Sequence, residues 1–570
     1  MSKGGRISMQ NKKRKLTGMK IISKLLALIG SLSYVIVIAV FNGSLGHILG
    51  IFIPVLGSVA VAKALGAAVS ISYAWLFALI ITFGILRGIL RYFEQYANHY
   101  IAFKLLAKMR DIIFQKLRVL CPAKLETKQK GTIISMITAD IETIEVFYAH
   151  TISPVGIALI SSLTMVLFIG FSVNWYMAIF AAFAYLIVAI LLPLLSQKTT
   201  MEVGQRYRKQ FTAFNGYFMD AIKGSKDIIL HGKEEEHKEN IDLNTDKLLE
   251  SSTDLKNKGL TMNVITNMVV IILNLCMLSL GLILVKFVNL SAPIMLVGVV
   301  ALMSSYGPVL ALAALPNSLS QTFASGERVF DLLAEEPAVR DIENKNEIEA
   351  DSVKVENLSF SYGQNPVLDN VSVEVKKGEI VGIMGESGCG KSTLLKLLLR
   401  FWKKQKGRIL YNGIEIEDLN TSSLKKNVVM VSQSTYLFED TIKGNLKIAK
   451  PSASDEEIIE ACKKAGIHDF VSSLKDGYDT KVGGKNAIFS AGESQRLAIA
   501  RCFLSDAQII LLDEPTSNVD AINEGIILKS LIMNKKDKAI IIVSHRESTM
   551  SIADRVYYFN SNGQETLHVA

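Results

Sequence analysis

A run of nine residues in the second half of the chain combines the residue types that bind phosphate groups. It follows the pattern G-x-x-x-x-G-K-[S/T], and its members are Gly385, Glu386, Ser387, Gly388, Cys389, Gly390, Lys391, Ser392 and Thr393. Glycines allow a tight backbone turn whose N–H groups point at phosphate oxygens. The lysine of this pattern reaches the β- and γ-phosphates, and the hydroxyl that follows holds Mg²⁺. The run therefore predicts a site for ATP and Mg²⁺.

The elements around this run must position it. Residues 379–384 form an apolar run that predicts a buried strand, and residues 393–399 predict a helix whose positive dipole end adds to phosphate binding. Alternating strand and helix patterns continue to the C-terminus, so we expect an α/β P-loop nucleotide-binding domain over residues 351–570. An acidic linker over residues 336–350 is expected to precede it.

The composition indicates that the first half of the chain lies in a membrane. Hydrophobic residues make up 50% of the 570 residues and charged residues only 20%. The net charge of +9 could suggest nucleic acid as a partner, but the basic residues lie in short stretches beside apolar segments, where they orient membrane proteins. We therefore expect a lipid bilayer and no nucleic acid. The five cysteines contain no C-x-x-C pair, which is typical of reduced thiols.

Residues 1–335 are expected to form an all-α membrane domain. A helix needs roughly 20 apolar residues to cross a bilayer, and about six stretches meet this requirement. They lie at about residues 25–61, 70–90, 152–173, 175–195, 262–285 and 293–315. The basic cluster at residues 12–15 and the basic segments after the second and fourth stretches place both termini in the cytosol. Amphipathic continuations of these helices should reach past the membrane. Their tips, near residues 125–131 and 224–232, would contact the cytosolic nucleotide-binding domain.

Several short motifs follow one another in the second half. They are Tyr362 on a strand ahead of the phosphate loop, Gln433 after Val431-Ser432, the run 509–516 with its Asp513-Glu514 pair, residues 517–520, and His545. Their order and spacing resemble the nucleotide-binding domain of ATP-binding cassette (ABC) transporters. The resemblance implies that Tyr362 stacks on adenine, that Gln433 links Mg²⁺ to the membrane domain, and that residues 517–520 cross to a partner.

The residue types at the acidic strand end and the histidine suit phosphoryl transfer. Asp513 can bind Mg²⁺ through water, Glu514 can accept a proton from the attacking water, and His545 can hydrogen-bond the γ-phosphate. With Lys391 these residues are the predicted catalytic and metal set, which also includes Ser392 and Gln433. Taken singly, Asp513 and Glu514 would be interpreted as a solvated pair and His545 as a core histidine.

One motif departs from the family pattern. Where the family usually has Leu-Ser-Gly-Gly-Gln, this chain has Phe489 followed by the predicted signature residues Ser490, Ala491, Gly492 and Glu493. In the family this motif faces the γ-phosphate held by another subunit, so the resemblance implies a dimer with a second half-transporter. A heterodimer is favoured and a homodimer stays possible, and in a heterodimer the partner's ATP would meet the altered signature and hydrolyse weakly. Cys389 is either a redox-sensitive thiol beside the phosphates or a tolerated small residue.

The membrane half carries a second resemblance. Residues 91–107, 139–144 and 147–154 look like the CydC-type subunit of heterodimeric ABC transporters tied to cytochrome bd assembly, whose signature also often ends in Glu. That family is described as exporting cysteine and glutathione, or as handling haem. Arg87, Arg91, Gln95 and His99 could then line a cavity for an anionic small-molecule cargo, with His99 as a haem ligand. The alternative is interfacial snorkelling, with Arg91 paired to a neighbouring Glu.

These observations predict an ATP-driven exporter subunit, an ABC-type ATPase, in the plasma membrane and most simply a bacterial inner membrane. Two alternatives stay open. One is a regulatory, weakly hydrolysing half of a heterodimeric exporter, and the other is an exporter of drugs, lipids or peptides.

Overall fold

The computed structural model describes residues 18–126, 128, 130–313, 315–363, 365–484, 489–517, 519–560 and 565–569. The predicted basic anchor at residues 12–15 and Asn518 of the predicted crossing loop lie outside these residues. The chain divides into two compact units. The first comprises Met1–Arg118 and Lys128–Glu335, and the second comprises Val119–Thr127 and Glu336–Ala570.

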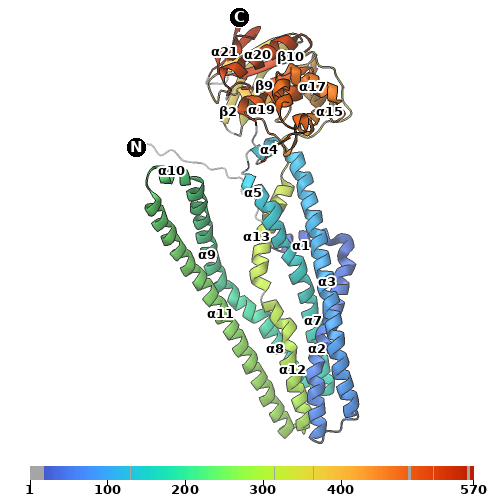
Figure 1. Ribbon diagram of the computed structural model, residues 1–570. Coiled ribbons are helices and arrows are strands. Elements are labelled where there is room, and N and C mark those ends of the chain that lie inside the picture. The colour runs from blue at the N-terminus through green and yellow to red at the C-terminus, as the bar shows by residue number, and fades with distance from the viewer. Residues whose placement is uncertain are drawn as a thin grey trace, which may run out of the picture. The chain divides into compact units, whose positions relative to one another are not determined.

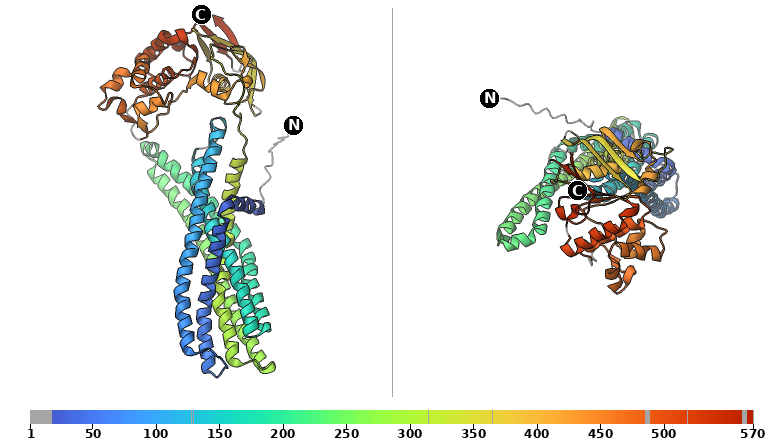
Figure 2. Two further views of the ribbon diagram at one scale, coloured as in Figure 1. Left: turned by 90° about the vertical axis from the view of Figure 1, so that its right-hand side faces the viewer. Right: turned by 90° about the horizontal axis from the view of Figure 1, so that it is seen from above.

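The first unit is built from helices, several of them very long (Figures 1 and 2). Its helices are α1 (Gly18–Ile29), α2 (Ser33–Ala64), α3 (Tyr73–Leu120), α5 (Lys130–Ser135), α6 (Ile141–Phe147), α7 (Ser153–Ser172), α8 (Trp175–Leu186), α9 (Leu192–Lys223), α10 (Ser225–Leu230), α11 (Glu234–Phe287), α12 (Ala292–Ala313) and α13 (Leu315–Ala334). Short π-helical turns at Met136–Asp140, Tyr148–Ile152 and Ile187–Leu191 join some of them.

Among the residues that the structure describes, six helical segments of this unit are long and apolar enough to cross a membrane, which confirms the expected six-helix domain. They are Gly18–Ala64, Tyr73–Leu120, Gly131–Ser172, Trp175–Leu195, Glu234–Phe287 and Ala292–Leu312. α3 has 48 residues and α11 has 54. At about 1.5 Å per residue each extends over about 70–80 Å, more than twice the roughly 30 Å of bilayer hydrocarbon.

Close packing between α2, α7, α8, α11 and α12 forms the core of the helical unit. Met165, Met177 and Met277 are fully buried there. α9 and α11 lie side by side, and the short α10 joins them at one end (Figure 1). At that end Ile229 and Leu230 are 63% and 68% exposed, so the predicted tip presents apolar side chains to its surroundings.

The second unit contains two main sheets. The antiparallel sheet has the order β2-β1-β4-β5, and the larger sheet has the order β12-β11-β3-β10-β9-β6. The strands are β1 (Ser352–Tyr362), β2 (Asn365–Lys376), β3 (Ile380–Gly385), β4 (Lys406–Tyr411), β5 (Ile414–Glu415), β6 (Val428–Val431), β9 (Ile509–Asp513), β10 (Ala539–Ser544), β11 (Arg555–Phe559) and β12 (Glu565–Val569), with a small separate pair β7 (Asp440–Thr441) and β8 (Lys481–Val482).

The pairing of the larger sheet decides where its loops meet. β3, β10, β9 and β6 are neighbouring parallel strands, and in this register Ser544 lies opposite Met384 while Val543 lies opposite Asp513. Parallel strands end at the same edge of a sheet, so the loops that follow these strands emerge together. The strands are apolar and almost entirely buried, as expected for parallel strands covered on both faces.

Helices flank these sheets and complete the predicted α/β domain. They are α14 (Lys391–Leu398), α15 (Thr421–Asn427), α16 (Ile442–Lys447), α17 (Asp455–Lys464), α18 (His468–Ser473), α19 (Ala491–Leu504), α20 (Ala521–Asn534) and α21 (Glu547–Met550). The segment Val119–Thr127, which contains α4 (Ala123–Glu126), belongs to this second unit. Its Glu126 Oε2 accepts a hydrogen bond from Lys396 Nζ of α14 at 2.7 Å.

Gly43 provides a test of helix packing in the first unit. A Cβ at this position of α2 would lie 2.3 Å from Ile157 Cδ1 and 2.9 Å from Glu94 Cδ, both on buried side chains. Gly43→Ala should therefore destabilise the chain by about 1–3 kcal/mol through overpacking. The thermal unfolding midpoint of the detergent-solubilised chain, followed by circular dichroism, measures this effect.

The matched control for this test is Gly57→Ala in the same helix. A Cβ there meets no atom within 4 Å among the described residues. Its midpoint should stay unchanged or rise, because alanine favours a helix over glycine by up to about 1 kcal/mol. Equal midpoints for the two variants would contradict the packing of α2 in the structure.

Candidate functional site

The predicted phosphate loop leaves β3 and enters α14, as the sequence indicates. Gly388 and Gly390 have φ values of +89° and +101°, a conformation that side-chain-bearing residues rarely adopt. A Cβ on Gly390 would also lie 2.6 Å from Leu368 Cδ2 and 2.8 Å from the carbonyl oxygen of Val367. Both observations explain why this position requires glycine. The loop borders a cavity of about 420 Å³, which is lined by Ser387, Gly388, Gly390, Lys391, Ser392, Thr393, Gln433, Glu514 and His545.

Lys391 is held by the loop itself. Its Nζ donates hydrogen bonds to the carbonyl oxygens of Gly385 and Glu386, both at 2.7 Å, and lies 3.8 Å from Cys389 Sγ. The lysine is only 5% exposed and Cys389 only 3% exposed. A cation so placed can neutralise phosphate charge, whereas the buried thiol lacks the solvent access that redox-sensing cysteines have.

The end of β9 brings a carboxylate to the start of α14. Ser392 Oγ donates to Asp513 Oδ1 at 2.9 Å. Burial raises the pKa of the Asp513 carboxyl, the Ser392 hydrogen bond lowers it, and the neighbouring Glu514 raises it again. A cation beside these oxygens would offset the cost of the buried charge. The hydroxyl and the carboxylate are hard oxygen donors, which fit Mg²⁺.

Glu514 connects the two flanking loops. Its Oε2 accepts a hydrogen bond from Gln433 Nε2 at 3.0 Å, and its Oε1 lies 3.2 Å from His545 Nδ1. Its backbone has a φ of +48°, and its N–H donates to the carbonyl oxygen of Val543 at 2.9 Å. A left-handed conformation is costly for a residue with a side chain, and such outliers cluster at functional sites. The structure thus gathers the sequence-predicted residues from four loops at one edge of the sheet.

Sequence reasoning missed the network behind His545. Arg546 donates from Nη1 to the carbonyl oxygen of Thr516 at 2.7 Å and pairs through Nη2 with Glu524 Oε2 at 2.8 Å. Glu524 is 5% exposed and also accepts a hydrogen bond from Ser548. These contacts tie the segment after Glu514 to the segment after His545. The signal in the sequence was small: an arginine next to the histidine, and an acidic residue in the first turn of α20.

Tyr362 ends β1 on the side of the phosphate loop. Its Oη lies 3.4 Å from Thr393 Oγ1, and its ring meets the ring of Trp402 edge to face with centroids 5.1 Å apart. The partly exposed Tyr362 ring therefore rests on Trp402, a support that the sequence did not indicate.

The altered signature forms the start of α19. Ser490 Oγ accepts a hydrogen bond from the N–H of Glu493 at 3.3 Å, and Glu493 Oε2 accepts one from the N–H of Ser490 at 2.7 Å. This reciprocal arrangement is a capping box. The Glu493 carboxylate therefore lies over the N-terminus of its own helix.

The predicted cavity residues on α3 fall into two groups. Arg91 Nη1 donates to the buried Glu94 at 2.7 Å and contacts His47 Nε2 on α2 at 2.9 Å. Arg87 also approaches α2, at Gly50. Gln95 and His99 instead line a separate hollow of about 610 Å³ together with aromatic side chains of α3. The lining residues are Tyr92, Gln95, Tyr96, His99, Tyr100, Phe103 and Lys104.

A second histidine, not predicted from the sequence, stands beside His99. The rings of His99 and His150 meet edge to face with centroids 5.8 Å apart. Tyr96 stacks with Tyr92 and with Tyr100 along the same face of α3, at centroid distances of 6.4 and 6.5 Å.

Comparison with known proteins identifies the two units. A family model described as the ABC transporter transmembrane region matches residues 16–293, and one described as ABC transporter matches residues 368–517. A probable ABC transporter ATP-binding/permease protein of Haemophilus influenzae is 44% identical over 540 residues, which cover 95% of this chain and 98% of that protein.

Two more distant relatives agree with this assignment. An ATP-dependent lipid A-core flippase of Syntrophus aciditrophicus is 28% identical over 85% of this chain and 80% of its own length. A solved structure of a bacterial Atm1-family ABC exporter with ATP bound superposes with a TM-score of 0.78 at 22% identity, over 95% of both chains, and shows the shared fold. ABC exporters act as dimers in the membrane. The chain belongs to the ABC transporter family, as an exporter half-transporter whose transmembrane domain is fused to an ATP-hydrolysing nucleotide-binding domain.

Proposed function

We propose that ATP hydrolysis at the phosphate loop of this chain is carried out by Glu514 as the general base and by His545 as the residue that positions the γ-phosphate. The observation that carries this proposal is the position of Glu514, which contacts both Gln433 and His545 at the end of β9. Lys391 neutralises phosphate charge, and the loop N–H groups cradle the phosphates. Ser392, Asp513 and Gln433 would hold Mg²⁺, which supplies charge neutralisation when bound.

Glu514→Gln should abolish turnover while leaving ATP binding intact. A glutamine keeps the shape of the side chain and can still accept the hydrogen bond from Gln433, but it cannot take a proton. Loss of a general base typically costs about 10²–10⁴-fold in rate. Steady-state ATPase activity and ATP binding by filter assay, on the full-length chain with its partner, measure the two effects.

The control is Glu547→Gln, which removes an exposed carboxylate two residues beyond His545 and should leave both readouts unchanged. Unchanged hydrolysis by the complex with Glu514→Gln would overturn the assignment of the base. It would favour the second candidate, a regulatory half whose partner hydrolyses ATP.

The dimer partner is proposed to be a different half-transporter. In an ABC dimer the start of α19 would face the ATP held by the partner. Here Ser490 and Glu493 already satisfy each other in the capping box, and the Glu493 carboxylate adds negative charge where γ-phosphate charge would lie. A heterodimer confines this defect to one of its two ATP sites. The site built on Lys391 and Glu514 would then be the competent one.

Glu493→Gln tests the effect of the negative charge without changing the structure of the helix start. Glutamine also serves in a capping box, so the start of α19 should stay capped while the negative charge is lost. The substitution removes the repulsion between the Glu493 carboxylate and the γ-phosphate of the ATP held by the partner. Two like charges about 4 Å apart in water repel by about 1 kcal/mol, so ATPase activity at that site should rise about fivefold. Activity is measured in the complex with Glu514→Gln in this chain, which silences the other site.

The matched control is Glu460→Gln, an exposed carboxylate on α17 of the same domain. It should leave the ATPase activity unchanged. Equal activities for Glu493→Gln and Glu460→Gln would show that the signature charge does not limit hydrolysis.

The cargo is proposed to be a thiol such as cysteine or glutathione, or haem, bound along α3. The stacked tyrosines offer a flat aromatic face, and His99 with His150 offers two imidazoles of the kind that ligate haem iron. Lys104 at the same hollow suits an anionic group. The flippase relative supports a lipid cargo as the alternative.

The chain is proposed to lie in a bacterial inner membrane with both termini in the cytosol, and its domain boundaries are proposed at residues 335 and 351.

Stimulation of ATPase activity by candidate cargoes tests this assignment. Glutathione or haem should raise the activity of the reconstituted complex severalfold, whereas lipids and hydrophobic drugs should not. His99→Ala should weaken the stimulation by haem, since it removes one of two adjacent imidazoles. His231→Ala, on the exposed tip between α10 and α11, is the control. Stimulation by lipid alone would favour the flippase-like alternative.

A further inference from the structure

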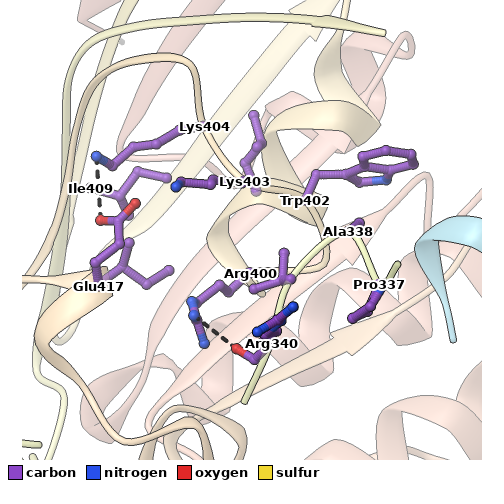
Figure 3. A pocket seen from close by; sticks show the side chains of 12 residues that line it. Pro337, Ala338, Arg340, Arg400, Trp402, Lys403, Lys404, Ile409 and Glu417 are labelled. Atoms are coloured by element: carbon purple, nitrogen blue, oxygen red, sulfur yellow. Dashed lines mark hydrogen bonds and ion pairs between the residues drawn. The ribbon is translucent and has the colours of Figure 1, made fainter. Parts of the chain in front are cut away.

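A cavity of about 330 Å³ lies in the second unit, and Trp402 forms part of its wall (Figure 3). Its wall comes from the linker, the C-terminal end of α14, the turn that follows, β4 and the short helix after β5. The lining residues are Pro337, Ala338, Val339, Arg340, Leu397, Arg400, Trp402, Lys403, Lys404, Ile409, Ile416 and Glu417. None of them belongs to the catalytic set described above.

The charges of this wall are strongly unbalanced. Arg340, Arg400, Lys403 and Lys404 face one carboxylate, that of Glu417. Lys404 is already paired, with Glu415 at 3.1 Å and with Glu417 at 3.3 Å. The other three cations form no ion pair with the residues that the structure describes. The cavity therefore carries a surplus of positive charge that no acidic side chain on its wall neutralises.

Arg400 is held rigidly at this wall. It follows the last turn of α14 with a φ of +55°, where the N–H groups of Arg400 and Phe401 donate to the carbonyl oxygens of Leu397 and Lys396. Glycine usually occupies this position of a helix C-terminus. The guanidinium donates to Thr421 Oγ1 and to the carbonyl oxygen of Arg340, each at 3.0 Å, and Figure 3 shows the second of these bonds. Burial lowers the pKa of Arg400, while Glu417 and Asp341 raise it, so burial of this cation is incompletely compensated.

The hydrogen-bonding capacity left over in the cavity consists mainly of donors, beside one acceptor, Glu417 Oε2, which is buried without a hydrogen-bond partner among the described residues. Arg340 and Lys403 can only donate, and Trp402 Nε1 is buried without a hydrogen-bond partner among the described residues. Leu397, Ile409 and the indole face supply apolar surface beside these donors.

We propose that this cavity binds a small organic anion, a phosphate or carboxylate group attached to a flat apolar body, and that its occupancy changes nucleotide affinity through Trp402. The anion would meet Arg340 and Lys403, and the body would pack on the apolar wall, which includes the indole of Trp402. A volume of about 330 Å³ is at the lower end of ordinary small-molecule sites.

The path from the cavity to the nucleotide site is short. Trp402 contacts Tyr362 edge to face at 5.1 Å and Phe360 at 6.1 Å, and the Tyr362 hydroxyl lies 3.4 Å from Thr393 of α14. A ligand that holds the indole in place also holds the ring of Tyr362. This second step rests on the role proposed for Tyr362 in stacking on adenine, whereas binding in the cavity does not.

The fluorescence of Trp402 reports binding directly. The chain has three tryptophans, so Trp75→Phe with Trp175→Phe leaves Trp402 alone. Phenyl phosphate titrated into the full-length double variant should give saturable binding at least about tenfold tighter than inorganic phosphate or phenol. Lys403→Ala and Arg340→Ala, both of exposed side chains, should each weaken binding about tenfold, as expected for loss of a charge-assisted hydrogen bond. Arg340→Ala keeps the backbone carbonyl that Arg400 uses.

Lys426→Ala removes an exposed lysine of α15 outside the cavity and is the matched control. Absence of saturable binding, equal affinity for phenol, or undiminished affinity in Lys403→Ala would overturn the site. The last result would place the probe elsewhere, for example on the phosphate loop.

The coupling to nucleotide binding needs a second measurement. Saturating phenyl phosphate should change the ATP dissociation constant about fivefold or more, and Lys403→Ala should abolish this change. An unchanged ATP affinity with intact probe binding would overturn the coupling alone.

Discussion

β3, β9 and β10 hydrogen-bond as neighbouring parallel strands, and the register of that pairing decides where the loops after them emerge. Val543 lies opposite Asp513, and Ser544 lies opposite Met384, so the phosphate loop, the acidic pair and His545 leave the sheet at one edge. Backbone hydrogen bonds set this geometry for any apolar side chains that pack on both faces. The site therefore depends first on the sheet and only then on side-chain contacts.

Side-chain contacts complete the site around Glu514. Its left-handed backbone costs about 1–2 kcal/mol, and the surrounding contacts offset this cost. The N–H of Glu514 donates to β10, its carboxylate meets Gln433 and His545, and Arg546 with Glu524 ties the two following segments together. Each of these contacts restricts the others, which is the kind of preorganisation that phosphoryl transfer requires.

The two ends of the nucleotide machinery differ in one physical respect. The start of α14 has no side-chain cap and carries the cation of Lys391, whereas the start of α19 is capped by the carboxylate of Glu493. Positive helix ends bind either an external anion or an internal one. A chain that uses its own carboxylate at that position offers less to a partner's phosphate, and this is the physical basis of the unlike partner proposed above.

The amino-acid sequence alone determined the six apolar spans, the α/β half and the identity of the phosphate-loop residues, because these follow from local patterns of hydropathy and from the fixed spacing of glycine, lysine and hydroxyl groups. It also indicated Asp513, Glu514 and His545, because their order and spacing resemble those of the ABC nucleotide-binding domain. It could not show that Arg91 turns to His47 and Glu94 while His99 faces His150, because helical spacing says nothing about which neighbouring helix each face meets. Only the tertiary structure showed that Trp402 contacts Tyr362 and that Arg340, Arg400 and Lys403 line one cavity. These contacts join segments that lie far apart along the chain.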